Sequence, residues 1–228
     1  MTADKAAAAR DAVPLRAQFR YVAVFVIVLV LLVFEILTPE ADWSRAVGIA
    51  LSSMALSVVV ATSRERAQVR RARSLLVAGA AALVVIGVAT GLLSAETTYV
   101  IGTLVLAAVP IALGGGVLRL INEEGVTIQA VAGALAIYLL IGLLFASAIA
   151  FVDAVDHGMY FTQTSHPPNG VRVYYSFTVI TTTGFGDYTA RTSAGHALAV
   201  LEMLTGQLYL VTVIGILVGN FVGRRMTK

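Results

Sequence analysis

The chain has 228 residues, of which 58% are hydrophobic and only 13% are charged, and its formal net charge is +3. Because roughly a quarter of the residues in a soluble domain are charged, this composition excludes an ordinary soluble protein and indicates an integral membrane protein. Cysteine is absent, which excludes a disulfide scaffold and any metal site built on thiolates.

Six stretches of the chain are apolar enough to predict membrane spans. A helix needs about 20 mainly apolar residues to cross a bilayer, and the stretches that qualify are residues 20–38, 44–62, 75–95, 98–119, 126–152 and 195–222. Residues 1–19 are polar and lack a cleavable signal pattern, so we expect them to be a cytoplasmic segment that precedes the first span. The first four spans predict a four-helix membrane domain over residues 20–121.

The positions of the basic residues predict the orientation. With six spans, only Arg45, Arg172 and Arg191 fall on one side of the membrane, and every other lysine and arginine falls on the opposite side. Basic residues are enriched in cytoplasmic connections. We therefore expect a plasma (inner) membrane protein with both termini in the cytoplasm, in contact with membrane lipids.

The fourth span occupies the position of a voltage sensor but lacks its charges. Residues 99–118 contain no lysine or arginine, and Arg119 stands alone at the end of the span. Each charge that crosses the field contributes about 2.3 kcal/mol per 100 mV. A span without such charges predicts a protein that is not steeply gated by voltage.

A shorter stretch between the last two spans predicts a re-entrant loop. Residues 172–182 allow about three helical turns, which is enough to enter the membrane but not to cross it. We call this short predicted helix the pore helix. After it, Gly184 and Gly186 can adopt backbone conformations that are closed to other residues. Carbonyl groups could then turn toward one axis and replace the water around an ion. The expected ligands are the carbonyls of Thr182, Thr183, Gly184 and Phe185, with the Thr182 hydroxyl at the inner end and Gly186 completing a filter over residues 182–186.

These residues resemble the potassium-channel pore family, whose filter pattern is T-V-G-Y-G-D. The resemblance covers roughly residues 126–225 and includes an aromatic pair with a serine, an acid after the filter and two inner-helix glycines: Tyr174, Tyr175, Ser176, Asp187, Gly195 and Gly206. It implies an all-α pore domain with an outer helix at 126–152, a pore helix at 172–182 and an inner helix at 195–222. It also implies a homotetramer, because four copies surround one ion. Thr183 replaces the usual valine and Phe185 the usual tyrosine, and we interpret both as changes in filter stiffness.

Helical spacing on the inner helix predicts a cavity. If Gly206 is a hinge beneath the filter, one stripe of side chains lines the cavity and its apolar end forms a gate: Gln207, Leu210, Ile214 and Val218. Ordinary packing around the glycines of this helix is the alternative.

Several polar residues are expected to support the filter from behind. Glu202 lies inside a span, where a carboxylate must face protein, and we expect it to bond Thr178 or Thr181 rather than to bind an ion. Asp187 is expected to bond Tyr174 or Tyr175, as the resemblance implies. Asp153 and Asp156 either add to a negative outer rim or are solvated loop charges.

The predicted function is passive, potassium-selective conduction through a homotetramer of six-span subunits, with no cofactor beyond the permeant potassium ion and no nucleic-acid partner. A weakly selective cation channel is the nearest alternative. A multi-span transporter or scaffold, in which TTTGFGD is only a loop, is the alternative from another class. An enzyme is not expected, because no span combines a nucleophile with a base.

Overall fold

The computed structural model describes residues 20–39, 41–62 and 95–226, together with residues 79, 82, 86, 87 and 90. The described helices are, in chain order, α3 (Arg20–Leu37), α4 (Asp42–Thr62), α6 (Ala95–Glu124), α7 (Ile128–Val155), α8 (Asn169–Ile180) and α9 (Ser193–Met226). Within these residues the strand pairing is limited to an isolated bridge between Phe161 and Ala190. The described part of the chain is therefore all-α, as the sequence predicts.

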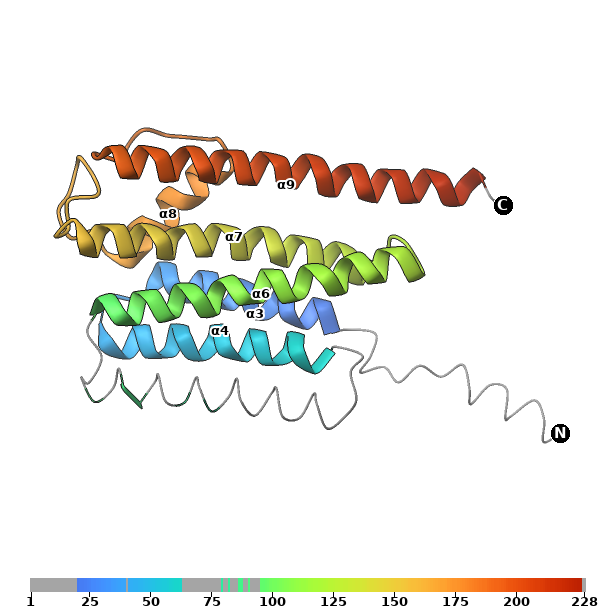
Figure 1. The fold of residues 1–228 in the computed structure, drawn as a ribbon, viewed down its shortest axis with the longest axis horizontal. Helices are drawn as coiled ribbons and strands as arrows, with labels where there is room; N and C mark the ends of the chain where they lie inside the picture. The colour runs from blue at the N-terminus through green and yellow to red at the C-terminus, as the bar shows by residue number, and fades with distance from the viewer. Residues whose placement is uncertain are drawn as a thin grey trace.

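The long helices lie side by side, and the short helix α8 lies between α7 and α9 at one end of the molecule (Figure 1). Helices α3 and α6 pack against α7 on the side away from α9, and α4 packs against α3 and α6. The connection from α6 to α7 and the C-terminal end of α9 lie at the end opposite α8. Arg119 and the end of α9 thus share one end of the molecule, as the basic-residue pattern requires.

Apolar helices of membrane-spanning length are present in the described part of the chain. Three segments are long and apolar enough to cross a membrane: Val100–Glu124, Ile128–Val155 and Ser193–Leu217. Helices α3 and α4 contain shorter apolar stretches, Tyr21–Leu37 and Ala46–Val59. The predicted span at 75–95 lies outside the described residues, apart from the isolated positions given above and residue 95. The full set of six spans remains a prediction.

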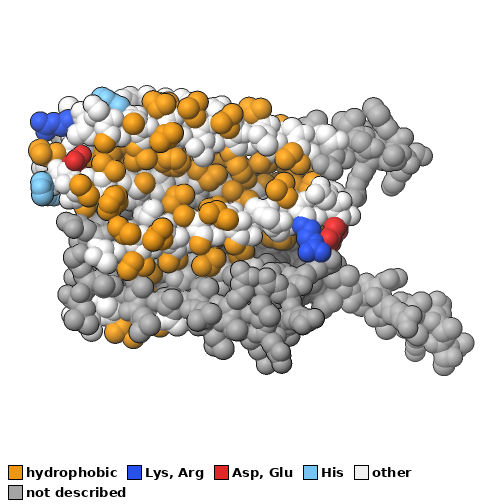
Figure 2. All heavy atoms as spheres, viewed as in Figure 1, with side chains coloured by type: hydrophobic (Ala, Val, Ile, Leu, Met, Phe, Trp, Pro, Cys, Tyr) orange, Lys and Arg blue, Asp and Glu red, His pale blue; other side chains and the backbone are white. Residues whose placement is uncertain are grey.

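The surface of the molecule has the pattern of a membrane protein. Figure 2 shows apolar side chains across the middle of the face formed by α6, α7 and α9, with charged side chains gathered at its two ends. Burying charged groups in hydrocarbon costs free energy, so charges at the ends and an apolar middle suit a bilayer.

The starts of α7, α8 and α9 differ from the predicted starts by two or three residues. Helix α7 begins at Ile128 instead of 126, because the Thr127 side chain accepts a hydrogen bond from the Ala130 amide at 3.2 Å. Helix α8 begins three residues before the predicted 172, directly after two prolines, and ends two residues before the predicted 182. Helix α9 begins two residues before the predicted 195, where Thr192 accepts a hydrogen bond from the amide of Gly195 at 3.2 Å.

Tyrosines fix the positions of the last three helices relative to one another. The Tyr209 hydroxyl on α9 donates to the carbonyl of Ala134 on α7 at 2.6 Å. The Tyr138 ring stacks on Tyr209 with centroids 5.9 Å apart, and its hydroxyl donates to the carbonyl of Ile180 at 3.3 Å. These contacts hold α7, α9 and the end of α8 together directly beneath the predicted filter.

Candidate functional site

The segment that follows α8 alternates in backbone handedness. The φ angle is +56° at Thr182, +52° at Gly184 and +80° at Gly186, whereas Thr183 and Phe185 between them have no positive φ. Positive φ suits glycine but costs roughly 1–2 kcal/mol for a residue with a side chain, so Thr182 is a strained position. An ordinary strand has negative φ at every residue, so this segment is not a strand.

Hydrogen bonds show which way the peptide groups of this segment point. The amides of Thr183 and Gly184 both donate to the carbonyl of Thr178 on α8, at 2.9 and 3.1 Å. In a planar trans peptide the N–H and C=O bonds point in opposite directions. The carbonyls of Thr182 and Thr183 therefore point away from α8, which is the orientation that an ion-binding backbone needs. Thr178 supports the segment through its main-chain oxygen, not through its hydroxyl.

The whole segment is exposed in the single chain, since residues 181–187 are all exposed. A Cβ atom built on Gly184 or on Gly186 would meet nothing within 4 Å, and Phe185 is 69% exposed. Carbonyls that point into open space cannot by themselves surround an ion. A complete coordination shell around an ion would need more carbonyls than one such segment supplies.

Side chains behind the segment form two contacts. The Thr181 hydroxyl donates to the carbonyl of Phe177 at 2.6 Å and lies 2.9 Å from the Thr183 hydroxyl. Since a hydroxyl has one hydrogen to donate, Thr183 must be the donor to Thr181. The extra hydroxyl that Thr183 brings to the filter thus has a partner within the same chain.

The aromatic pair on α8 divides between two surroundings. Tyr174 stacks on Phe185 with ring centroids 6.3 Å apart and planes 4° from parallel. Asp187 raises the pKa of the Tyr174 phenol, chiefly through a side-chain hydrogen bond. Tyr175 turns the other way and packs edge-on against Phe161, with centroids 5.0 Å apart. The structure therefore places Tyr174, and not Tyr175, beside Asp187.

The inner helix approaches the filter at Gly206. A Cβ on Gly206 would lie 2.6 Å from the carbonyl oxygen of Ile180, so the missing side chain lets α9 touch the end of α8. The next residue, Gln207, places its amide nitrogen 3.5 Å from the Thr182 hydroxyl oxygen. Helix α9 runs through Gly206 without a break, and a hinge at this position remains a proposal.

The predicted cavity stripe continues down α9 from Gln207. Leu210 is half-buried and Ile214 is exposed in the single chain, whereas the side chain of Val218 lies outside the described residues. The placement of Gln207 under Thr182 is consistent with a stripe that faces the conduction axis, and the gate at Ile214 and Val218 remains a proposal.

Glu202 contacts a different residue from those expected. Its side chain is fully buried, and its carboxyl oxygen Oε1 forms a hydrogen bond with the Ser176 hydroxyl on α8. Thr178 bonds the carbonyl of Tyr175 instead, at 2.8 Å. The expected bond from Glu202 to Thr178 or Thr181 is therefore wrong, because Ser176 occupies the face of α8 that meets α9.

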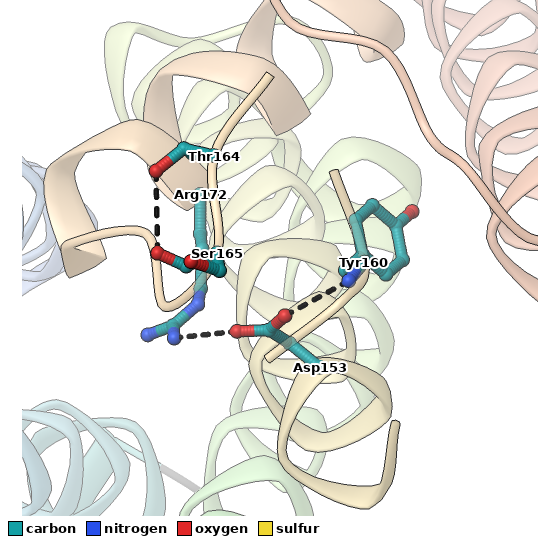
Figure 3. A network of polar contacts seen from close by, with 5 residues as sticks. All are labelled: Asp153, Tyr160, Thr164, Ser165 and Arg172. Atoms are coloured by element: carbon teal, nitrogen blue, oxygen red, sulfur yellow. Dashed lines mark hydrogen bonds and ion pairs between the residues drawn. The ribbon is translucent and has the colours of Figure 1, made fainter. Parts of the chain in front are cut away.

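Asp153 does not contribute to a negative outer rim. Its carboxylate is 2% exposed and pairs with the Arg172 guanidinium, which is 4% exposed, at 2.8 Å. The second carboxylate oxygen accepts the amide of Tyr160 at 3.1 Å (Figure 3). The pair ties the end of α7 to the start of α8, so neither the rim nor the solvated-loop expectation holds for Asp153.

Sequence reasoning missed a second polar contact at the start of α8. The Asn169 amide donates to the main-chain carbonyl of Glu35 at 3.3 Å and also to its carboxylate. These residues border a cavity of about 100 Å³ between α3, α4, α6 and α7. The available signal was an acid near the end of an apolar span, where a carboxylate needs a partner.

Comparison with known proteins identifies the class of this site. A family model described as "Ion channel" matches residues 133–222, which run from α7 through α9. The match confirms the resemblance to the tetrameric potassium-channel pore family over this segment. No curated protein and no solved structure gave a match. Residues 133–222 are thus similar to an ion channel, and this similarity, together with the apolar helices, indicates a membrane protein.

Proposed function

We propose that the protein is a potassium-selective channel formed by four copies of the chain around one axis. The observation that carries this proposal is the backbone of residues 182–186, whose φ alternates in sign and whose amides at Thr183 and Gly184 bond back to α8, so that the carbonyls of Thr182 and Thr183 point away from α8. Rings of such carbonyls replace the hydration shell of a potassium ion. Thr182, Thr183, Gly184 and Phe185 would supply the ligands from each subunit.

The apolar face of α9 supports assembly. Its side chains Leu201, Leu204, Leu208 and Val211 are 54–70% exposed in the single chain. In a tetramer with the filters at the centre, this helix would lie nearest the axis and the neighbouring subunits. The residues around 126–225 would then form the pore domain, and residues 20–121 would surround it.

A weakly selective cation channel is the second candidate function. Phe185 carries no hydroxyl and its ring stacks on Tyr174, so the filter lacks a hydrogen bond that a tyrosine at this position could make. A filter with fewer hydrogen bonds to its surroundings would adapt more easily to a smaller ion such as sodium. A transporter or scaffold, the remaining alternative, would not need fourfold assembly.

The surroundings of the pore support a weak response to voltage and a defined orientation. Helix α6 contains Arg119 as its single basic residue in the sequence, too few charges for steep gating. We place the filter at the outer surface of the plasma (inner) membrane and both termini in the cytoplasm, following the basic residues.

Reconstitution of the purified protein into liposomes tests the function. With potassium and sodium on opposite sides, a reversal potential near the potassium equilibrium value supports the potassium channel, and a value near zero supports the weakly selective one. Native mass spectrometry of the same sample reports stoichiometry. A monomer or dimer that shows no barium-sensitive rubidium flux would refute the channel tetramer.

A further inference from the structure

The Ser176 hydroxyl lies between two acceptors from two other helices. It is 2.7 Å from the carbonyl oxygen of Gly142 on α7 and within hydrogen-bonding distance of Oε1 of Glu202 on α9. Ser176 itself lies on α8, so this single oxygen joins the outer, pore and inner helices of the channel domain.

A count of hydrogens shows that these bonds need an additional proton. A serine hydroxyl has one hydrogen to donate and two lone pairs that accept. A carbonyl and an ionised carboxylate are both acceptors, so one hydroxyl cannot make a full hydrogen bond to each. We propose that Glu202 is held as a neutral carboxylic acid, which donates its proton to the Ser176 oxygen while Ser176 donates to the Gly142 carbonyl.

The surroundings of Glu202 favour the neutral form. The side chain is fully buried, and Oε2 has no hydrogen-bond partner among the described residues. Burying an oxygen without a hydrogen-bond partner costs far more free energy when the oxygen carries charge than when it belongs to a neutral acid. The ion pairs within the described residues join Arg119 to Glu123 and Arg172 to Asp153, so none of them reaches Glu202.

The titratable groups that face Glu202 are phenols, which are neutral at physiological pH. Tyr138 on α7, Tyr160 in the loop before α8 and Tyr175 on α8 all lie close enough to interact with it electrostatically. None of these three groups can balance a negative charge on Glu202. The proton on the carboxyl group is the remaining way to remove that charge.

Loss of this proton would weaken the junction of the three helices. An ionised Glu202 would take the Ser176 hydrogen and leave the Gly142 carbonyl without it, with a buried charge in addition. Glu202 lies one helical turn before Gly206, the contact between α9 and the end of α8. Alkaline pH should therefore loosen the support of the filter and reduce conduction. This regulatory step rests on the proposed channel function, whereas the protonation of Glu202 does not.

Infrared spectroscopy of the purified protein tests the protonation directly. We expect the wild-type protein to show the C=O stretch of a buried carboxylic acid, and Glu202→Gln to lose it. Glu124→Gln, which removes an exposed acid at the end of α6, should leave the band unchanged. Glu35→Gln identifies any contribution from the half-buried carboxyl group of Glu35. A Glu202→Gln spectrum that retains the full band overturns the proposal. If Glu202→Gln fails to assemble, Ser176→Ala should shift the band, because the acid loses its acceptor, and an unshifted band contradicts the proposal equally.

Rubidium flux into liposomes tests the regulation. Between about pH 5 and about pH 9, a range in which buried carboxyl groups titrate, wild-type flux should fall at least severalfold. Glu202→Gln should conduct without this fall, because its amide is neutral and still donates to Ser176. A fall of the same size in Glu202→Gln overturns the regulatory step. If no variant conducts at any pH, the proposed function fails, while the infrared result still decides the protonation.

Discussion

Gly206 on the inner helix is in direct contact with the carbonyl group of Ile180, the last residue of the pore helix. A Cβ atom at position 206 would lie 2.6 Å from this oxygen and 2.5 Å from the Cγ1 atom of Ile180. The oxygen belongs to the main chain and also accepts the Tyr138 hydroxyl at 3.3 Å. It therefore cannot move aside cheaply, and the contact fixes the distance between α9 and the filter segment.

Replacement of Gly206 by alanine should separate α9 from α8 and abolish most ion flux. The added methyl group must displace main-chain atoms, which costs on the order of 1–3 kcal/mol as overpacking. Gly215→Ala is the matched control, because a Cβ there would meet nothing within 4 Å on the same helix. Rubidium uptake and the melting temperature of the detergent-solubilised protein measure the effect. Equal behaviour of the two variants would show that the close contact is unimportant.

Replacement of Gly184 by alanine should impair conduction for a different reason. Position 184 has open space around it but a φ of +52°, so the cost of roughly 1–2 kcal/mol per subunit comes from the backbone conformation. We expect flux to fall at least tenfold while the protein still assembles. Gly115→Ala, in a helix and also with open space, serves as the control. Normal flux through Gly184→Ala would contradict a filter that depends on left-handed backbone.

The fold of the pore segment was predictable because its signals are local. Apolar stretches indicated α7 and α9, and the spacing of Gly184 and Gly186 indicated two backbone conformations that are closed to other residues, which their positive φ angles match. The third left-handed position, Thr182, was not predictable, since a β-branched residue gives no sign that it will adopt positive φ.

The polar contacts behind the filter were harder to predict, because they depend on which helix faces meet. Glu202 was expected to be buried against α8, and it is, but its partner follows from the rotation of α8 about its axis. Asp153 and Arg172 are separated by a loop whose path the sequence does not reveal. A single sequence supplies the positions of charged residues along the helices and not the rotations that pair them.

Disruption of the pair between Asp153 and Arg172 should destabilise the protein. Removal of one partner leaves a buried charge uncompensated, which costs about 3–5 kcal/mol. We expect Arg172→Met to lower the melting temperature strongly, and the double variant Asp153→Leu with Arg172→Met to recover part of the loss. The exposed pair between Arg119 and Glu123 gives the comparison, since its removal should change stability by about 1 kcal/mol or less. Additive effects of the two substitutions in the buried pair would argue against a direct interaction.

The contact between the hydroxyls of Thr181 and Thr183 should be measurable as a coupling free energy between the two residues. Either Thr181→Val or Thr183→Val removes the 2.9 Å contact, so the double variant should lose about 0.5–1.5 kcal/mol less than the sum of the singles. Thermal unfolding of the wild type, the two single variants and the double variant completes this double-mutant cycle. The potassium-to-sodium permeability ratio should change in the same direction in both single variants if this contact stiffens the filter. Opposite changes would separate the contact from selectivity.

The contact between Asn169 and Glu35 joins α3 to α8. Asn169 donates to the main-chain carbonyl of Glu35 at 3.3 Å and also to its carboxylate. Beside it, a Cβ on Gly170 would lie 2.6 Å from the carbonyl oxygen of Ile36. The end of α3 therefore rests on the first turn of α8, and a shift of α3 would be transmitted to the pore helix.

Asn169→Ala should thus loosen α3 from α8 without a steric clash. The loss of its hydrogen bonds leaves polar atoms of Glu35 with fewer partners beside the cavity of about 100 Å³, which costs roughly 1–3 kcal/mol. Gly170→Ala should separate the same two helices by steric contact, so both variants should alter rubidium flux in the same direction. Thr164→Ala, in the loop before α8 and bonded to its neighbour Ser165, should leave flux unchanged. Wild-type flux in Asn169→Ala and Gly170→Ala alike would show that the N-terminal helices do not influence the pore through this contact.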